Sequence, residues 1–119
     1  MELAKILISL GGGLLMVSFG INQLRKPQAW LDYVPQWFLK SSPFSPTNFM
    51  RLHALGNVAF GLFLFVGVIF FSGLISLVAA WVALLWMASI VPFAFQKDWS
   101  IGMRDLSITL ALAALVALL

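Results

Sequence analysis

The chain has no cysteine and a single histidine. Without cysteine it can form no disulfide bond, and it has no thiolate to attack a substrate or to hold zinc, haem or an iron–sulfur cluster. A lone imidazole without a carboxylate cluster leaves most of the coordination shell of a metal unfilled. We therefore expect no metal site and no covalently bound cofactor.

Charged residues are also scarce: they make up 9% of the 119 residues, whereas hydrophobic residues make up 62%. Soluble domains carry about a quarter charged residues, and a soluble core of this size could not bury so much apolar surface. The mean hydropathy of +1.04 points to a protein embedded in the lipid bilayer. The few basic residues lie beside apolar segments, which gives no support to nucleic-acid binding.

Four apolar segments have the length of about 20 residues that a helix needs to cross a bilayer. They cover about residues 3–24, 47–71, 74–95 and 99–119. The first runs on to Ile21 without a small-residue cleavage site, so we interpret it as a span and not as a signal peptide. The sequence predicts an all-α fold: a single transmembrane domain over residues 1–119, built as an up-down four-helix bundle.

Local features indicate where these helices begin, turn and bend. Ser45 followed by Pro46 is typical of a helix start, with the serine as N-cap and proline in the first helical position. Ser72 and Gly73 predict a tight turn, which makes the second and third spans antiparallel. Pro92 predicts a kink near the end of the third span.

The fourth span must begin earlier than its purely apolar part. Residues 106–119 alone would extend about 21 Å, which is short of a hydrocarbon core of roughly 30 Å. A start near Trp99 gives sufficient length, but it places Arg104 and Asp105 inside the helix. Because an isolated charge is costly at that depth, we expect both residues to have partners.

Basic residues flank the spans unevenly. The N-terminal side has only Lys5, whereas the two loop regions on the opposite side carry Arg25, Lys26, Lys40, Arg51, Lys97 and Arg104. The positive-inside rule then predicts a multi-pass protein of the plasma or inner membrane, with both long loops in the cytoplasm and both termini outside.

An aromatic segment follows the first span. Trp30, Tyr33 and Trp37 are spaced so that they share one face if the segment is helical. The segment is too short and too polar to cross the bilayer, so we predict a short interfacial or re-entrant element broken near Pro35. The three rings form either an ordinary aromatic belt or a lid over a pocket between the helices.

Polar residues inside the spans gather on the loop side of the predicted bundle. In one interpretation they only fix the bundle, with Asp105 pairing Arg51 or Arg104, or they snorkel at helix ends. In the other they form a pocket for a polar headgroup reached from the membrane, in which His53 can exchange a proton. The residues of this predicted pocket are Asn22, Gln23, Arg51, His53, Asn57, Arg104 and Asp105.

Small residues suggest where helices approach one another. Gly11, Gly12 and Gly13 follow no strand, so they fit close helix packing better than a phosphate-binding loop. Thr109, Ala113 and Ala117 form a small-residue seam on the last span. That seam favours contact within the bundle or with another subunit.

Four short motifs occur along the chain: Ser18-Phe19-Gly20-Ile21-Asn22-Gln23-Leu24, Trp30-Leu31-Asp32-Tyr33-Val34-Pro35, His53-Ala54-Leu55-Gly56-Asn57 with Gly61, and Arg104-Asp105. Together they resemble the DoxX-like family of small four-helix membrane proteins. The resemblance implies an up-down four-helix fold and an association with membrane redox chemistry, since some members are subunits of a thiosulfate:quinone oxidoreductase. The polar positions that match the family pattern are Arg51, His53, Asn57, Arg104 and Asp105.

Two hypotheses for function follow. The first is a quinone-linked or redox-associated subunit whose polar residues hold a quinone headgroup under the aromatic segment. It would need a redox partner subunit to move electrons. The second is a non-enzymatic accessory or scaffold protein that joins a larger membrane assembly or a homo-oligomer through its small-residue seams. A third hypothesis is a small transporter or lipid-handling protein, which would need to form oligomers. The sequence leaves open whether the chain is an enzyme.

Overall fold

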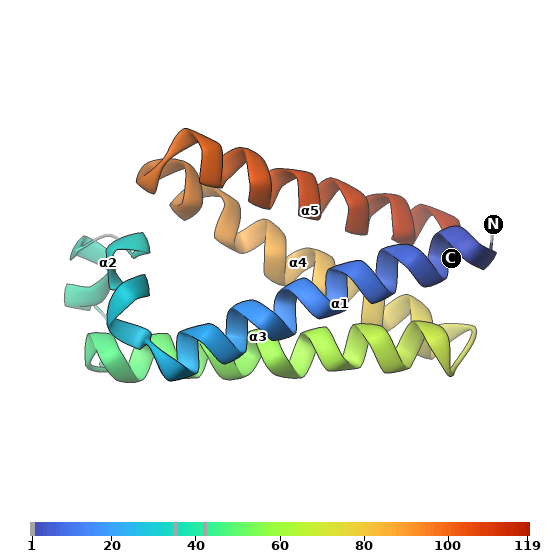
Figure 1. Ribbon diagram of the computed structural model, residues 1–119, viewed down its shortest axis with the longest axis horizontal. Helices are drawn as coiled ribbons and strands as arrows, with labels where there is room; N and C mark the ends of the chain where they lie inside the picture. Colours follow the sequence, from blue (N-terminus) through green and yellow to red (C-terminus); the bar gives the residue numbers. More distant parts are fainter. Residues whose placement is uncertain (1, 35, 42) are drawn as a thin grey trace.

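The computed structural model describes residues 2–34, 36–41 and 43–119, and this part of the chain is all-α (Figure 1). The four long helices are α1 (Glu2–Arg25), α3 (Pro46–Ile69), α4 (Leu74–Lys97) and α5 (Trp99–Leu118). Each is long and apolar enough to cross a membrane. The predicted fold class is confirmed: the protein is a multi-pass membrane protein built as a bundle of four helices.

A short helical segment separates α1 from α3, as predicted. It consists of the 3-10 helix η1 (Pro27–Tyr33) and the helix α2 (Gln36–Ser41), which together we call the cap. The predicted break near Pro35 concerns a residue outside the described ranges. The cap lies at the end of the bundle opposite the two chain termini (Figure 1).

The starts of α3 and α5 follow from their capping residues. The Ser45 hydroxyl accepts a hydrogen bond from the backbone N–H of Asn48 at 3.2 Å, and Pro46 follows it in the first turn. At the start of α5, an Asp98 carboxylate oxygen accepts from the backbone N–H of Ser100 at 2.8 Å. Both predicted starts are confirmed, because these side chains bond N–H groups that have no partner inside the helix.

The turn between α3 and α4 depends on a glycine. Gly73 has a φ of 66°, a left-handed conformation that costs glycine little, and α4 then runs antiparallel to α3 (Figure 1). Helix α4 continues through Pro92 to Lys97. The kink expected at Pro92 stays a prediction.

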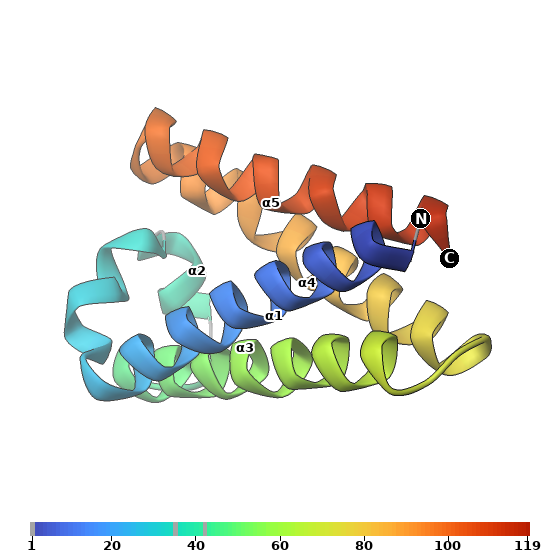
Figure 2. The same ribbon diagram turned by 45° about the vertical axis from the view of Figure 1, so that its right-hand side comes forward.

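The helices are paired differently at the two ends of the bundle. Near the cap, α1 lies beside α3 and α4 lies beside α5, and the two pairs stand apart in both views (Figures 1 and 2). Toward the termini, α4 crosses to α3 and α1 approaches α5. The buried core forms where all four helices meet; it comprises Met16, Leu64, Ala80, Ala83, Met87, Leu112 and Leu115.

Small residues allow the closest helix contacts. A Cβ on Gly13 of α1 would lie 2.9 Å from the carbonyl oxygen of Gly61 on α3, and a Cβ on Gly61 would lie equally close to the Gly13 carbonyl oxygen. The expected close packing is therefore confirmed for Gly13. Gly11, in contrast, faces open space.

The small-residue seam predicted on α5 is not its main buried face. The buried residues of α5 are Gly102, Asp105, Leu112 and Leu115, whereas Ala117 is exposed. The hydroxyl of Thr109 donates to the Asp105 carbonyl oxygen of its own helix at 2.8 Å. Contact of this seam with another subunit stays a prediction.

A polar and aromatic cavity beneath the cap

A cavity of about 760 Å³ opens where the two helix pairs separate, and all four long helices and the cap contribute to its wall. Its volume falls within the range of about 300–1,000 Å³ that is usual for small-molecule sites. Most of the wall is aromatic or aliphatic. The aromatic residues are Phe19, Trp30, Tyr33, Phe38, Phe49, Phe60, Trp86 and Phe93, and the main polar residues are Gln23, His53, Asn57, Arg104 and Asp105.

A hydrogen-bond network joins three helices at one side of this cavity. The Asn57 amide donates to the Gln23 amide oxygen at 2.8 Å, and the Asn57 oxygen accepts from the Trp86 indole N–H at 2.6 Å. Asn57 and Trp86 lie at the middles of the 24-residue helices α3 and α4. An unpaired polar group is costly at that depth in a membrane, so the network holds α1, α3 and α4 in register.

The Trp86 ring lies against α3 between two other rings. It stacks on the His53 ring with centroids 5.1 Å apart and an angle of 17°, and it meets the Phe60 ring edge-on at 4.8 Å. Gly56 lies beneath it, and a Cβ on Gly56 would collide with the indole. Gly56 therefore makes room for the indole, which in turn fixes the plane of the His53 ring on the cavity wall.

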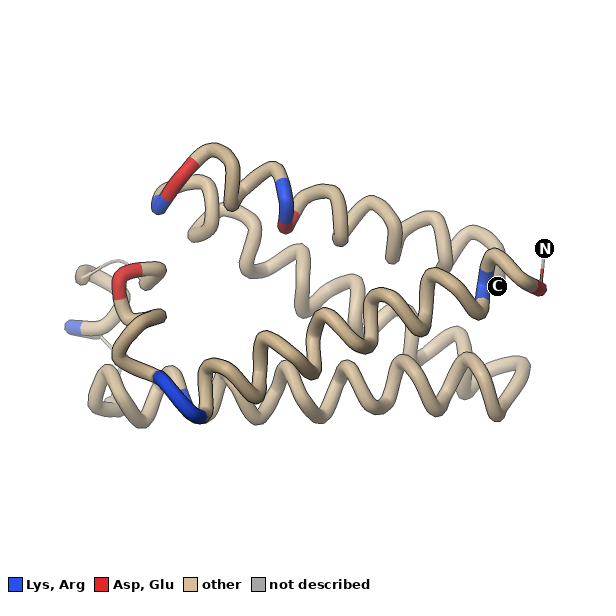
Figure 3. The backbone as a smooth tube through the Cα atoms, in the orientation of Figure 1, with Lys and Arg blue, Asp and Glu red and all other residues tan. Residues whose placement is uncertain are grey.

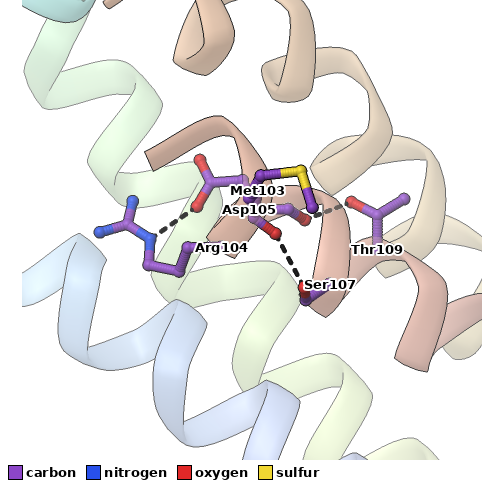
Figure 4. A network of polar contacts seen from close by, with 5 residues as sticks. All are labelled: Met103, Arg104, Asp105, Ser107 and Thr109. Atoms are coloured by element: carbon purple, nitrogen blue, oxygen red, sulfur yellow. Dashed lines mark hydrogen bonds and ion pairs between the residues drawn. The ribbon is translucent and has the colours of Figure 1, made fainter. Parts of the chain in front are cut away.

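Arg104 and Asp105 pair with each other in the second turn of α5 (Figure 4). The Arg104 Nε donates to an Asp105 carboxylate oxygen at 2.9 Å, and the Asp105 side chain is 7% exposed against 40% for Arg104. The guanidinium carbon lies 4.8 Å from the centre of the Phe19 ring on α1. The expectation that both charges have partners is confirmed, and this pair places a donor and an acceptor at the cavity.

The cap covers the end of the cavity through several contacts with the bundle. The Trp30 indole donates to the Asn22 side-chain oxygen at 2.7 Å, and its ring lies 5.1 Å from that of Tyr33. Lys97 of α4 lies 3.6 Å from an Asp32 carboxylate oxygen and 5.9 Å from the centre of the Tyr33 ring.

The structure brings most of the predicted site residues to one cavity. Gln23, His53, Asn57, Arg104, Asp105, Trp30 and Tyr33 line it. Asn22 stands behind the wall and holds Trp30. Arg51 is exposed outside the wall, and among the described residues no hydrogen bond or ion pair reaches it. Trp37 lies in α2, apart from the other two rings of the predicted lid, and is 62% exposed.

Sequence reasoning missed Trp86, which bonds Asn57 and stacks on His53. An indole N–H in the middle of a span needs an acceptor, and that requirement was the available clue. Phe38 and Phe93 were also missed: their rings meet at 5.8 Å and join the cap to α4. Nothing in the apolar pattern of α4 distinguishes Phe93 from its lipid-facing neighbours.

The cavity offers aromatic faces, amide groups, one imidazole and one ion pair. Within the described residues, no group of three or more histidine, cysteine or acidic side chains is placed to hold a metal ion. Such a wall suits a planar, uncharged ligand with hydrogen-bonding oxygens. Comparison with known proteins finds no matching family model, no similar curated protein and no similar solved structure.

Proposed function

We propose that the protein is a quinone-linked or otherwise redox-associated membrane subunit, and that the cavity beneath the cap holds the quinone headgroup. The observation that carries the proposal is the combination of a largely aromatic wall with a few polar side chains inside a membrane-spanning bundle. Aromatic faces stack on a planar ring, and N–H donors bond its carbonyl oxygens.

The roles of the individual residues follow from their chemistry. Arg104 donates to one carbonyl oxygen of the ring. Among the described residues its hydrogen bond to Asp105 uses only Nε, which leaves the other N–H groups of the guanidinium for the ligand. Proton exchange with the ligand falls to His53 or Asp105. Reduction of a quinone to the quinol takes two electrons and two protons. The protons would pass through these side chains, and a redox partner subunit would supply the electrons.

Two further expectations belong to this proposal. The resemblance of the sequence motifs to DoxX-like proteins agrees with a quinone-linked role, although the proposal rests on the cavity and not on family membership. The excess of basic residues at the cap end, which Figure 3 shows, agrees with a cytoplasmic cap.

Binding of a short-tailed benzoquinone to the protein in lipid nanodiscs tests the proposal. The quinone quenches tryptophan fluorescence, so a titration gives Kd directly. Arg104→Ala should weaken binding roughly tenfold or more, since it removes a charge-assisted hydrogen bond. Arg51→Ala is the matched control, because Arg51 lies outside the cavity, and it should leave Kd unchanged.

The alternative hypothesis, a non-enzymatic accessory subunit, predicts a different result. In that case no quinone binds with saturation, and Arg104→Ala lowers stability without any ligand effect. A folded wild-type protein that shows no saturable quenching would therefore overturn the proposal.

A further inference from the structure

One side of the cavity reaches the outer surface of the bundle between α3 and α4. Leu52 and Leu55 line the cavity and are nevertheless 52% and 54% exposed. Ala59, one turn further along α3, and Ser89 on α4 also line it and are exposed. Leu52, Leu55 and Ala59 have helical spacing, so they form one stripe along α3. In a bilayer this stripe faces the acyl chains.

The cap end of the cavity and its α1–α5 side are obstructed by polar contacts. At the cap end, the indole of Trp30 is bonded to Asn22, and Asp32 is paired with Lys97. On the α1–α5 side, the Arg104 guanidinium lies over the Phe19 ring. A long apolar chain leaving the cavity would meet charged or hydrogen-bonded groups on both of these sides, whereas the α3–α4 side presents hydrocarbon.

We infer that the gap between α3 and α4, bordered by Leu52, Leu55, Ala59 and Ser89, is the lateral entrance of the cavity and takes the apolar tail of a lipid-like ligand. This inference rests on the proposed function and specifies its ligand class: a planar head group carrying a long isoprenoid or alkyl tail. The head group reaches Trp86 and His53, while the tail stays in the gap and extends into the bilayer.

Association kinetics of benzoquinones with the same ring and tails of zero, one or two isoprenoid units test the entrance. Ala59→Phe narrows the gap and should slow association of the tailed quinones about tenfold, and association of the smaller tail-less ring by less. Ala114→Phe is the matched control, because Ala114 is exposed on α5 and does not line the cavity. Lys97→Ala, which loosens the cap, should leave these rates unchanged.

Quenching by brominated lipids gives a second reading that needs no quinone. In a variant that keeps Trp86 and replaces the other four tryptophans with phenylalanine, bromines on the acyl chains should quench Trp86, and Ala59→Phe should reduce that quenching. If quenching responds but no quinone binds, the entrance stands and the proposed function falls. If quinones bind while neither quenching nor tailed-quinone rates respond to Ala59→Phe, or if Lys97→Ala speeds association for every tail, the inference is overturned.

Discussion

In the core of the bundle, α1 and α3 come so close that a Cβ on Gly13 would lie 2.9 Å from the Gly61 carbonyl oxygen. Beside the cavity, the same bundle places an aromatic ring between two helices: Trp86 of α4 lies on Gly56 of α3. Both regions use glycine. In the first, two glycines face each other and the backbones touch, whereas in the second one glycine faces a ring and the helices stay apart.

The difference explains why α3 and α4 stand apart beside the cavity while α1 and α3 stay in contact. Within lipid, helices associate mainly through close packing and hydrogen bonds, so small facing residues leave no space between them. An indole resting on a glycine fills its own contact but holds the two helices at the width of a ring. The Asn57 amide then bonds that indole and the Gln23 side chain, which stabilises the separated arrangement.

The largest predicted effect breaks the closely packed region. Gly13→Leu places a branched side chain against the Gly61 backbone, which cannot move aside, and should lower the free energy of unfolding by about 3 kcal/mol. Gly11→Leu is the control two residues away, where nothing lies within 4 Å of an added Cβ. Equilibrium unfolding in mixed detergent micelles measures both. Equal destabilisation by the two changes would contradict the assigned contact.

The second prediction breaks the separated region. Asn57→Leu removes the acceptor of the Trp86 N–H and the donor to Gln23, and should lower the free energy of unfolding by about 1–3 kcal/mol. Trp86→Phe removes the orphaned N–H, so the double variant should cost clearly less than the sum of the two single changes. Strict additivity in the same unfolding assay would show that the two side chains are not coupled.

Much of the fold follows from the sequence because the start and end of each helix depend on nearby residues. Bilayer thickness requires α5 to start near Trp99, and Asp98 caps that start. The pairing of the helices is not local. Whether Arg51 or Arg104 partners Asp105 depends on how α3 and α5 are placed, and the structure selects Arg104, the neighbour in sequence.

The candidate site is predictable only in its polar members. Asn57 and His53 stand out in an apolar helix, but Trp86 is hidden in one, because its ring suits the lipid as well as the protein interior. Trp37 lies apart from the other two rings for a different reason. Its spacing from Trp30 and Tyr33 assumes one continuous helix, whereas the chain divides the three rings between η1 and α2.

The smallest predicted effect concerns the turn between α4 and α5, and it should change only the stability of the cap end of the bundle. The exposed Asp98 carboxylate accepts hydrogen bonds from the backbone N–H and from the hydroxyl of Ser100. These bonds, the backbone one more than the hydroxyl one, hold the pKa of Asp98 below its ordinary value. Because the folded-state pKa is depressed, the stabilisation is complete above the unfolded-state pKa and is lost as the pH falls through the folded-state pKa, below about pH 4. The wild-type melting temperature should therefore fall between pH 6 and pH 3 slightly more than that of Asp98→Asn, which caps the helix without titrating.

The same comparison made in Gly13→Leu should give the same small difference, since the core contact between α1 and α3 involves no titrating group. A pH-dependent difference that changes with the Gly13 substitution would mean that the two regions are coupled and do not pack independently.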